Sequence, residues 1–260
     1  MLLALDVSNT TIKAGVFRGE TLVADWRFAT ERHRLPDDYA MLLLTLFQTA
    51  GIAVNQITGA AISCVVPPLR SVFDALARQY LKVEPVLVGP ETPSGVVLAV
   101  EHPSEVGADR IVNVAATHRL YGGPAIAVAF GTATVFDCVS AQGEYLGGAI
   151  APGVVTALES LASSAAQLYQ IDLVPPPRAM GRNTVHTMQS GLILGFAGLV
   201  EGLVARLRRE LAPEDPPETV KVIATGGLAE IIAPHTEAIQ VLDPWLTLRG
   251  LQIIHALNRP

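Results

Sequence analysis

Two copies of a strand, turn and strand, set 123 residues apart, constrain the fold of this chain more than any other feature. Residues 3–12 read LALDVSNTTI and residues 126–135 read IAVAFGTATV, so each apolar strand runs into a small turn and out again. In both copies a further turn leads to a third strand. Duplication at so long a period predicts two similar α/β halves that face one another, rather than a solenoid of short repeats. We place these halves at residues 1–120 and 121–260.

The rest of the chain alternates helical and extended patterns. Apolar residues recur either at helical spacing or in short runs bounded by turn-forming residues, which separates expected helices from expected strands. Beyond the two hairpins we expect strands at residues 21–28, 57–66, 84–89, 145–151 and 220–227, and helices at residues 36–51, 71–81, 103–120, 155–168, 187–211, 228–233 and 246–257. The acidic, proline-rich segment LAPEDPPE at residues 211–218 predicts a stiff surface loop.

The composition excludes several classes of function. With a net charge of −6, the chain lacks the basic surface that binding to nucleic-acid phosphates requires. Cys64 and Cys138 lie in apolar stretches and the histidines form no metal-ligand pattern, so we expect buried thiols and no structural zinc. The apolar runs at 40–47 and 95–100 are far shorter than the roughly 20 residues that span a bilayer, and MLLALD lacks the basic start of a signal peptide. We therefore expect a cytoplasmic protein with no membrane or nucleic-acid partner.

Two turns and one glycine pair are suited to binding phosphate and a nucleoside. The turns at residues 8–11 and 131–134 carry small hydroxyl side chains and backbone N–H groups that can cradle a phosphate. The segment ATGG at residues 224–227 places glycines where a strand meets a helix, so a base or ribose can lie against bare backbone. Neither GxGxxG nor GxxxxGK[ST] occurs, which removes the main support for a dinucleotide-binding or P-loop protein.

A carboxylate and an arginine stand side by side in the segment HPSEVGADRIVNVAATHRL. Pro103 and Ser104 are expected to open a helix with residues 107–110 in or near its first turn. One interpretation is structural: Asp109 complements the helix dipole and Arg110 is a surface cation. The other is functional: Asp109 is a base that takes a hydroxyl proton, and Arg110 is a cation that holds an acidic substrate.

Taken in order, these motifs resemble those of the type III pantothenate kinases, within the sugar kinase, Hsp70 and actin superfamily. The resemblance runs from LALDVSNT through AISCVVP, EVGADR, FGTATVFD, GGAIAPG, GRNT, MQSGLILG and ATGGLA to LTLRGL, which is essentially the whole chain. EVGADR and GGAIAPG are specific to the family, whereas the hairpins identify only the superfamily. The resemblance implies two ribonuclease H-like halves, a duplicated actin-like ATPase fold with the active site in the cleft between them. It also implies a homodimer that phosphorylates pantothenate with ATP, the first step toward coenzyme A.

The same resemblance implies roles for individual residues. Asp109 matches the general base, Gly107 and Arg110 match substrate contacts, and Thr184 matches a substrate contact made across the dimer. Asp6 matches the acid that organises Mg²⁺ and the phosphates. The other nucleotide contacts that the resemblance implies are Asn9, Thr10, Thr11, Gly131, Thr132, Gly226 and Gly227. A monovalent cation, K⁺ or NH₄⁺, is implied as well.

Two residues depart from the family pattern. The family has glycine where Ser8 stands and aspartate where Ala129 stands, and Asp137 does not replace the missing acid. If the first turn needs a positive φ, the Cβ of Ser8 disfavours it by about 1 kcal/mol or more. Loss of the second carboxylate predicts either a turnover slower by on the order of 10² to 10³ fold or a changed cation dependence.

Two alternative functions therefore stay open beside pantothenate phosphorylation. Ser8 and Ala129 favour a catalytically weakened protein that binds or regulates, as the Bvg accessory factors of this fold do. A kinase for another small hydroxy acid is the second alternative, because the lining of the substrate pocket is only partly readable.

Overall fold

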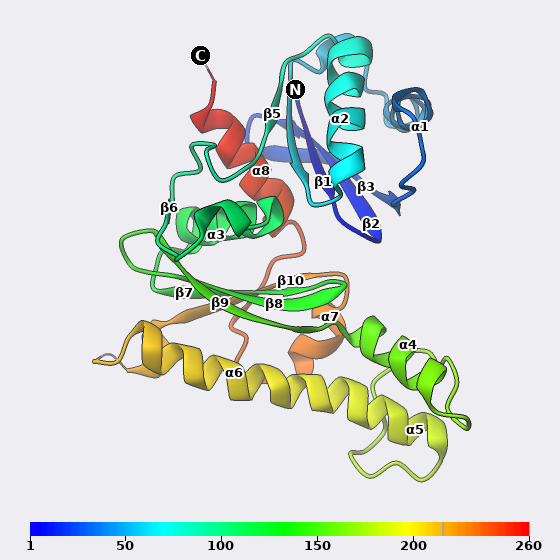
Figure 1. Ribbon diagram of the computed structural model, residues 1–260, viewed down its shortest axis with the longest axis vertical. Helices are drawn as coiled ribbons and strands as arrows, with labels where there is room; N and C mark the ends of the chain where they lie inside the picture. The colour runs from blue at the N-terminus through cyan, green and yellow to red at the C-terminus, as the bar shows by residue number, and fades with distance from the viewer. Residues whose placement is uncertain (215, 260) are drawn as a thin grey trace. The chain divides into compact units, whose positions relative to one another are not determined.

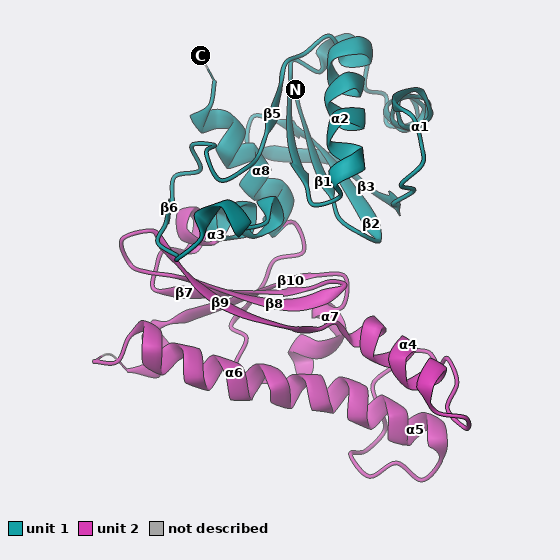
Figure 2. Cartoon of the chain, viewed as in Figure 1, with its two compact units in different colours: residues 1–116, 246–260 teal, residues 117–245 magenta. Residues whose placement is uncertain are grey.

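The computed structural model describes residues 1–214 and 216–259, and the chain divides into two compact units (Figures 1 and 2). The first unit comprises Met1–Ala116 with Leu246–Pro260, and the second comprises Thr117–Trp245. Each unit has its own sheet and its own helices, so the fold is mixed α/β, as predicted. The predicted halves, residues 1–120 and 121–260, describe the sequence repeat and remain a prediction. The compact units have other bounds, because the chain passes from one unit to the other after residue 116 and returns before residue 246.

The first unit is built on a five-stranded sheet in the order β3-β2-β1-β4-β5. Strand β1 pairs antiparallel with β2 and parallel with β4. Strand β1 is buried along its whole length and reads LLALDV, as expected of a central strand covered on both faces. The edge strand β3 alternates between exposed and half-buried residues. The strands are β1 (Leu2–Val7), β2 (Thr11–Arg18), β3 (Thr21–Ala29), β4 (Gly59–Cys64) and β5 (Pro85–Leu87).

Helices cover both faces of this sheet. On one face, α1 (Pro36–Thr49) and α2 (Pro67–Leu76) contribute the aromatic core around Tyr39, Phe47 and Phe73. The other face is covered by the C-terminal helix α8 (Leu246–Leu257). Helix α8 is tied to α3 (Ala108–Tyr121) by the Thr247 hydroxyl, which donates a hydrogen bond to Asn113 Oδ1 at 2.9 Å. This contact lies within the first unit, because Asn113 precedes its boundary.

The second unit repeats the same strand plan, which confirms the predicted meander. Its strands lie in the order β11-β10-β7-β8-β9, with β7, β8 and β9 antiparallel and β10 parallel to β7. Strand β10 therefore stands beside β7 as β4 stands beside β1. The strands are β7 (Ala125–Phe130), β8 (Ala133–Val139), β9 (Glu144–Pro152), β10 (Lys221–Gly226) and β11 (Val241–Leu242).

The helices of the second unit are α4 (Val154–Ser164), α5 (Thr184–Gln189), α6 (Gly195–Leu211) and α7 (Ala229–Ile232). A π-helical turn over Ser190–Leu194 joins α5 to α6, so the two form one continuous run. This run, Thr184–Leu211, has 28 residues and contains an 18-residue window with a mean hydropathy of 1.5, so length and composition alone would let it cross a membrane, which the sequence analysis did not anticipate. One side packs into the core of the unit through Phe196, Val200 and Val204, as an amphipathic core helix does.

Several boundaries differ from the sequence prediction. Helix α2 begins at Pro67 rather than after the two prolines, because a proline at the first helical position needs no N–H partner and already has a helical φ. Pro103 and Ser104 open a separate 3₁₀ turn, Pro103–Glu105, and α3 begins only at Ala108. Helix α4 ends at Ser164, before the predicted residue 168.

The remaining elements are short. Strand β6 (Val97–Leu98) and the 3₁₀ turns Val54–Gln56 and Pro217–Thr219 were not expected. The predicted helix at residues 71–81 ends in a π-helical stretch, Ala77–Leu81, and the predicted helix at residues 228–233 is followed by a 3₁₀ turn, Ala233–His235. In the predicted loop at residues 211–218, α6 ends at Leu211 and Pro217 starts one of these 3₁₀ turns. Residue 215 of that loop lies outside the described residues.

Candidate active site

The turn between β1 and β2 adopts its conformation without the glycine of the family pattern. Among the described residues, Lys82 is the only non-glycine residue with a positive φ, so Ser8 meets no left-handed strain. The Ser8 N–H donates to the Thr11 carbonyl at 3.3 Å, and its hydroxyl donates to Asp6 Oδ2 at 3.4 Å. The destabilisation that would accompany a positive φ at Ser8 therefore does not apply.

Residues that follow β3 brace this turn, and the sequence analysis missed them. The Thr30 hydroxyl donates to the Ser8 carbonyl at 2.7 Å, and the Thr30 N–H donates to the Thr10 carbonyl at 3.0 Å. The Arg32 guanidinium donates to Asn9 Oδ1 at 3.2 Å. The predicted meander could have indicated these residues, because the end of an antiparallel third strand lies beside the turn that joins the first two strands.

Asp6, the last residue but one of β1, is a buried carboxylate and is only 4% exposed. Burial raises its pKa to about 6; the charge of Lys13 opposes this shift and that of Asp109 adds to it. Its Oδ1 atom is buried and has no hydrogen-bond partner among the described residues. Those residues contain no group of three or more His, Cys, Asp or Glu side chains that could hold a metal ion. An unpartnered carboxylate oxygen without a protein cage fits Mg²⁺, which is usually held by one or two carboxylates together with water and substrate phosphates.

Asp109 and Arg110 lie in the first turn of α3, within the same unit as Asp6. Both side chains are half-buried, so Arg110 is not the surface cation of the structural interpretation. Asp109 Oδ1 accepts a hydrogen bond from the Arg110 N–H at 2.9 Å. Burial raises the pKa of Asp109 above its ordinary value, while the N–H and the charge of Arg110 oppose the shift. A Cβ at Gly107 would lie 2.6 Å from Asp109 Oδ1, so glycine at this position leaves room for the carboxylate.

The turn between β7 and β8 is held by the start of α4. The Thr132 carbonyl accepts hydrogen bonds from the Gly153 N–H at 3.0 Å and from the Thr156 hydroxyl at 2.8 Å. The Gly131 N–H donates to the Ala133 carbonyl at 3.0 Å. A Cβ at Gly131 would meet only that carbonyl, at an ordinary 3.6 Å, so the fold itself does not require glycine there.

The two glycines at the end of β10 differ in how closely other atoms approach them. Gly226 pairs with Phe130 at the end of β7 and has a φ of +101°. A Cβ on Gly226 would lie 2.3 Å from the Phe130 carbonyl oxygen, so the two strand ends meet backbone to backbone. Around Gly227, no atom lies within 4 Å of the position that a Cβ would take. Gly226 therefore shapes the strand end, and Gly227 leaves bare backbone beside it.

Among the described residues, the cross-strand neighbours of Ala129 carry no carboxylate that could bind a cation. Its cross-strand neighbours are Val135 on β8 and Thr225 on β10. The Thr225 hydroxyl oxygen is buried and lacks a hydrogen-bond partner among the described residues, but it is a single neutral oxygen. Asp137 lies on β8, two residues after Val135, and accepts a hydrogen bond from the Tyr145 hydroxyl at 3.0 Å. This donor set does not fit a monovalent cation held by a carboxylate.

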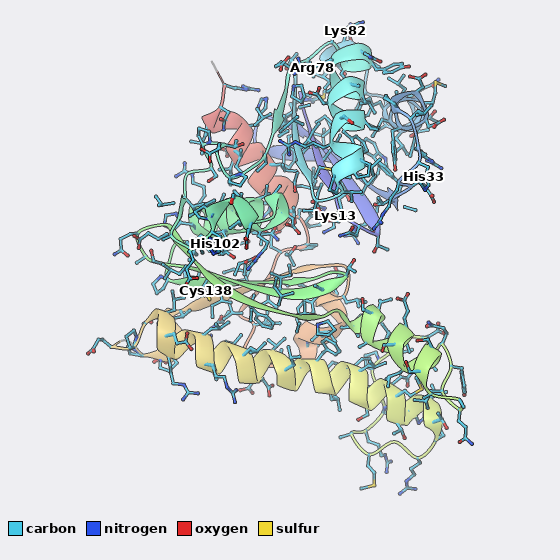
Figure 3. All side chains as sticks on the ribbon, in the orientation of Figure 1. Lys13, His33, Arg78, Lys82, His102 and Cys138 are labelled. Atoms are coloured by element: carbon cyan, nitrogen blue, oxygen red, sulfur yellow. The ribbon has the colours of Figure 1, made fainter. Side chains whose placement is uncertain are left out.

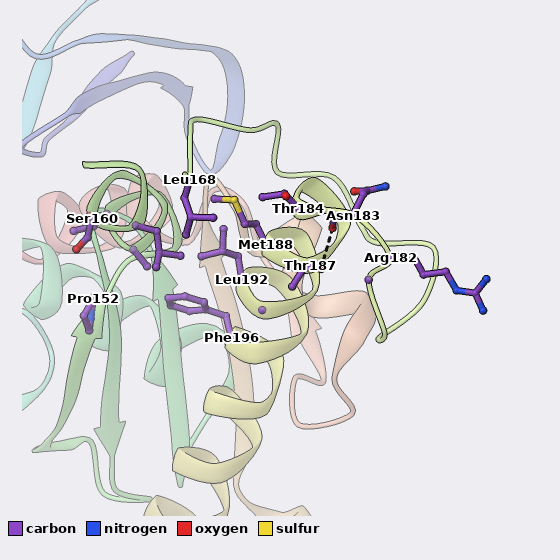
Figure 4. Close-up of a pocket in the computed structure, with 15 residues that line it drawn as sticks. Pro152, Ser160, Leu168, Arg182, Asn183, Thr184, Thr187, Met188, Leu192 and Phe196 are labelled. Atoms are coloured by element: carbon purple, nitrogen blue, oxygen red, sulfur yellow. Dashed lines mark hydrogen bonds between the residues drawn. The ribbon is translucent and has the colours of Figure 1, made fainter. Parts of the chain in front are cut away.

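Thr184 lies in the second unit, at the mouth of a cavity of about 1060 Å³ (Figure 4). It is the first residue of α5, and the Asn183 side chain caps this helix by accepting the His186 N–H at 2.8 Å. The lining is mostly apolar and includes Leu161, Leu168, Met188, Leu192 and Phe196. Thr156, whose hydroxyl donates to the Thr132 carbonyl, also lines the cavity, so the cavity begins beside the turn between β7 and β8.

The structure groups the predicted residues by unit. The predicted residues in the first unit are Asp6, Asn9, Thr10, Thr11, Gly107, Asp109 and Arg110. Within this unit, the charge of Asp109 raises the pKa of Asp6. In the second unit, Gly131, Thr132, Gly226 and Gly227 gather at the ends of β7 and β10, and Thr184 lies at the cavity.

Comparisons with known proteins identify the family and the fold. The sequence profile described as type III pantothenate kinase matches residues 2–206. The type III pantothenate kinase of Roseiflexus sp. (strain RS-1) is 55% identical over 259 residues, and that of Geobacter sulfurreducens is 45% identical over 259 residues; both alignments cover 100% of each chain. Among solved structures, a Campylobacter jejuni protein assigned to the Baf family is 17% identical, with a TM-score of 0.61 over 98% of each chain. The polyphosphate/ATP-glucomannokinase of Arthrobacter sp. strain KM is 14% identical, with a TM-score of 0.53 over 99% of each chain.

The solved structures establish the fold alone, which is the duplicated α/β fold of sugar kinases and actin-like ATPases. The profile match and the full-length relatives go further. The chain belongs to the type III pantothenate kinase family.

Proposed function

We propose that this chain transfers the γ-phosphoryl group of ATP to the primary hydroxyl of pantothenate, the first step of coenzyme A biosynthesis. The observation that carries the proposal is the half-buried Asp109, which lies beside Arg110 at the start of α3, in the same unit as the buried Asp6. Full-length relatives named type III pantothenate kinase, at 45% to 55% identity, support the same substrate. We also propose that the protein is cytoplasmic, because it uses ATP and a small acid as substrates.

In the proposed mechanism, Asp109 takes the hydroxyl proton of pantothenate while the hydroxyl oxygen attacks the γ-phosphorus and ADP leaves. Arg110 binds the pantothenate carboxylate, and the backbone at Gly107 lies against the substrate. The raised pKa of Asp109 suits a base, because a carboxylate less acidic than usual takes a proton more readily. Phosphoryl transfer depends mainly on positioning and charge neutralisation, which these residues provide.

Two turns and one glycine pair bind the nucleotide in this proposal. The turn holding Asn9, Thr10 and Thr11 and the turn holding Gly131 and Thr132 donate N–H and hydroxyl groups to the phosphates. The backbone at Gly226 and Gly227 receives the nucleoside. Asp6 holds Mg²⁺, which when bound supplies positive charge to the phosphate oxygens.

A monovalent cation is not part of this proposal. The neighbours of Ala129 include no free carboxylate, so the chain lacks the anionic donor that its family pattern provides. We therefore expect turnover without added K⁺ or NH₄⁺.

We also propose that the chain works as a homodimer in which Thr184 of the partner subunit contacts pantothenate. The exposed, largely apolar cavity at Thr184 supports an interface at this face of the second unit. Sedimentation at micromolar concentration should give a dimer, and a monomer alone at that concentration would contradict this assignment.

The test is ATP-dependent phosphorylation of pantothenate by the purified protein with Mg²⁺, with and without K⁺, beside the Ala129→Asp variant and a panel of other hydroxy acids. We expect the wild-type protein to turn over at about 1 s⁻¹ or faster with pantothenate and to be insensitive to K⁺. A silent wild-type protein together with an active Ala129→Asp variant would point instead to a binding or regulatory protein. Faster turnover of another hydroxy acid would reassign the substrate.

A further inference from the structure

Asp6 and Ser63 form a pair of buried polar side chains at the carboxyl ends of two parallel strands in the first unit. Strand register places Asp6 on β1 opposite Ser63 on β4 and opposite Lys13 on β2, which is labelled in Figure 3. Residues in register point to the same face of a sheet, so the three side chains share one face. Asp6 and Ser63 are each the last residue but one of their strand. In open α/β sheets, ligands bind at the carboxyl ends of the parallel strands.

Both side chains carry a buried atom that the protein does not pair. Ser63 is completely buried, and its Oγ atom has no hydrogen-bond partner among the described residues, like Asp6 Oδ1. Of the unpartnered buried side-chain atoms in that part of the chain, only these two lie in register on neighbouring strands. A strand covered on both faces ordinarily carries apolar residues, and burying a hydroxyl without a partner is unfavourable. The Ser63 hydroxyl therefore costs stability in the free protein.

The Ser63 hydroxyl lies close to the Asp6 carboxylate. Burial raises the pKa of Asp6, and the Ser63 hydroxyl is one of the groups that oppose this shift. The two groups are nevertheless not in hydrogen-bonding geometry, since Ser63 Oγ has no partner. A hydroxyl can turn its hydrogen toward an acceptor that comes within range. A donor therefore stands beside this carboxylate without being bonded to it.

The second unit carries the same hydroxyl without the carboxylate. Thr225 on β10 lies opposite Ala129 on β7, as Ser63 lies opposite Asp6 in the first unit. The Thr225 hydroxyl is also buried and without a partner among the described residues. The strands pair in the same way whether a carboxylate or a methyl group stands beside the hydroxyl, so the fold does not need the Asp6 and Ser63 pair. That pair occurs only in the unit in which we place the metal.

We propose that Ser63 is a positioning residue of the metal site, and that its hydroxyl donates a hydrogen bond to the Asp6 carboxylate when Asp6 binds Mg²⁺. The inference rests on the proposed function for the metal at Asp6. Carboxylates that bind metal ions are in turn held by hydrogen-bonding groups, which fix their orientation. The Ser8 hydroxyl already donates to Asp6 Oδ2, but at 3.4 Å that bond is long. A second donor at Ser63 fixes the plane of the carboxylate.

The test compares how tightly the wild-type protein, Ser63→Ala and Asp6→Asn bind Mn²⁺ with saturating ADP, measured from the electron paramagnetic resonance signal of free Mn²⁺. Mn²⁺ is the probe because it takes the same carboxylate and water ligands as Mg²⁺. Ser63→Ala should weaken Mn²⁺ binding by about 10- to 100-fold, the usual effect of removing a group that holds a metal ligand. Its affinity for ADP in EDTA should equal that of the wild-type protein, because the hydroxyl acts through the metal. Its midpoint in urea should not fall, because the free protein loses no hydrogen bond.

Thr117→Val is the matched control. The Thr117 hydroxyl is likewise buried and without a partner among the described residues, but Thr117 lies on α3 rather than in register with Asp6. This variant loses a buried hydroxyl of the same kind and should bind Mn²⁺ and ADP like the wild-type protein.

Wild-type Mn²⁺ affinity in Ser63→Ala, together with weaker binding by Asp6→Asn, would overturn the role of Ser63 and leave the metal at Asp6. Wild-type affinity in both variants would remove the metal from Asp6, so this inference and that part of the proposed function would fail together. Weaker ADP binding by Ser63→Ala in EDTA, or a lower midpoint in urea, would show that Ser63 serves the nucleotide or the fold instead. Pantothenate takes part in none of these measurements, so a different substrate would leave the result for Ser63 unchanged.

Discussion

Replacement of Asp109 by asparagine should lower kcat for pantothenate phosphorylation by about 10³-fold and leave the affinity for ATP nearly unchanged. Asparagine keeps the size of the side chain and can still accept the Arg110 N–H, which bonds Asp109 Oδ1 at 2.9 Å, so the start of α3 should persist. It cannot take a proton. Steady-state kinetics with saturating ATP and pantothenate measure the effect.

Glu105→Gln is the matched control, since Glu105 is an exposed carboxylate in the 3₁₀ turn just before α3. This variant should retain wild-type kcat. An Asp109→Asn enzyme with unchanged kcat would show that no base is needed at this position, and the assignment of Asp109 would be wrong.

The acid side of the pH profile reports the same two carboxylates. Burial raises the pKa of Asp6 to about 6 and that of Asp109 above its ordinary value, and both groups must be ionised to act. Protonation at low pH therefore removes activity, and kcat/KM should fall as the pH falls through about 6. Because the two charges interact, the midpoint belongs to the pair rather than to either residue.

The Gly226→Ala variant should lose stability and nucleotide binding together, whereas Gly227→Ala should keep its stability. A methyl group on Gly226 would meet the Phe130 carbonyl oxygen at 2.3 Å, and the φ of +101° is one that alanine rarely adopts. The expected loss in the free energy of unfolding is about 2 kcal/mol or more, because close contact and strain act at one position. Urea denaturation measures this loss, and ADP titration measures the binding.

Gly227→Ala separates the two effects, since nothing in the protein lies within 4 Å of the new methyl group. Weaker ADP binding by this stable variant would place the nucleoside against Gly227. Wild-type binding would exclude that contact. If Gly226→Ala were as stable as the wild-type protein, the close approach of β7 and β10 would not constrain this strand end.

The strand plan was predictable from the sequence because its signal is repeated. Each meander shows apolar runs and turn residues in the same order, and β1–β3 and β7–β9 formed as expected. Helix ends were less predictable. Pro103 and Ser104 resemble the start of a helix, but they form a separate 3₁₀ turn before α3. Gly107 therefore lies directly before the helix that carries Asp109.

The residues around the candidate site were predictable where they follow a motif and not where they depend on pairing. Asp6 and Asp109 lie in recognisable stretches, whereas Lys13 gains its place only from register with Asp6, and Thr30 from the return of β3. The expectation of backbone strain at Ser8 came from the glycine that the family pattern has at this position. The backbone of the turn settles it, because φ at Ser8 is not positive.

The return of the C-terminal helix to the first unit sets the order in which a newly made chain can finish folding. Helix α8 covers one face of the sheet that contains Asp6, so that sheet stays uncovered on this face until residues 246–257 leave the ribosome. The second unit is continuous in sequence and is synthesised in full before α8 appears. Vectorial synthesis usually completes N-terminal regions first. The first unit therefore begins first and is completed last, and truncation before α8 would uncover one face of the sheet that holds Asp6 and leave the second unit intact.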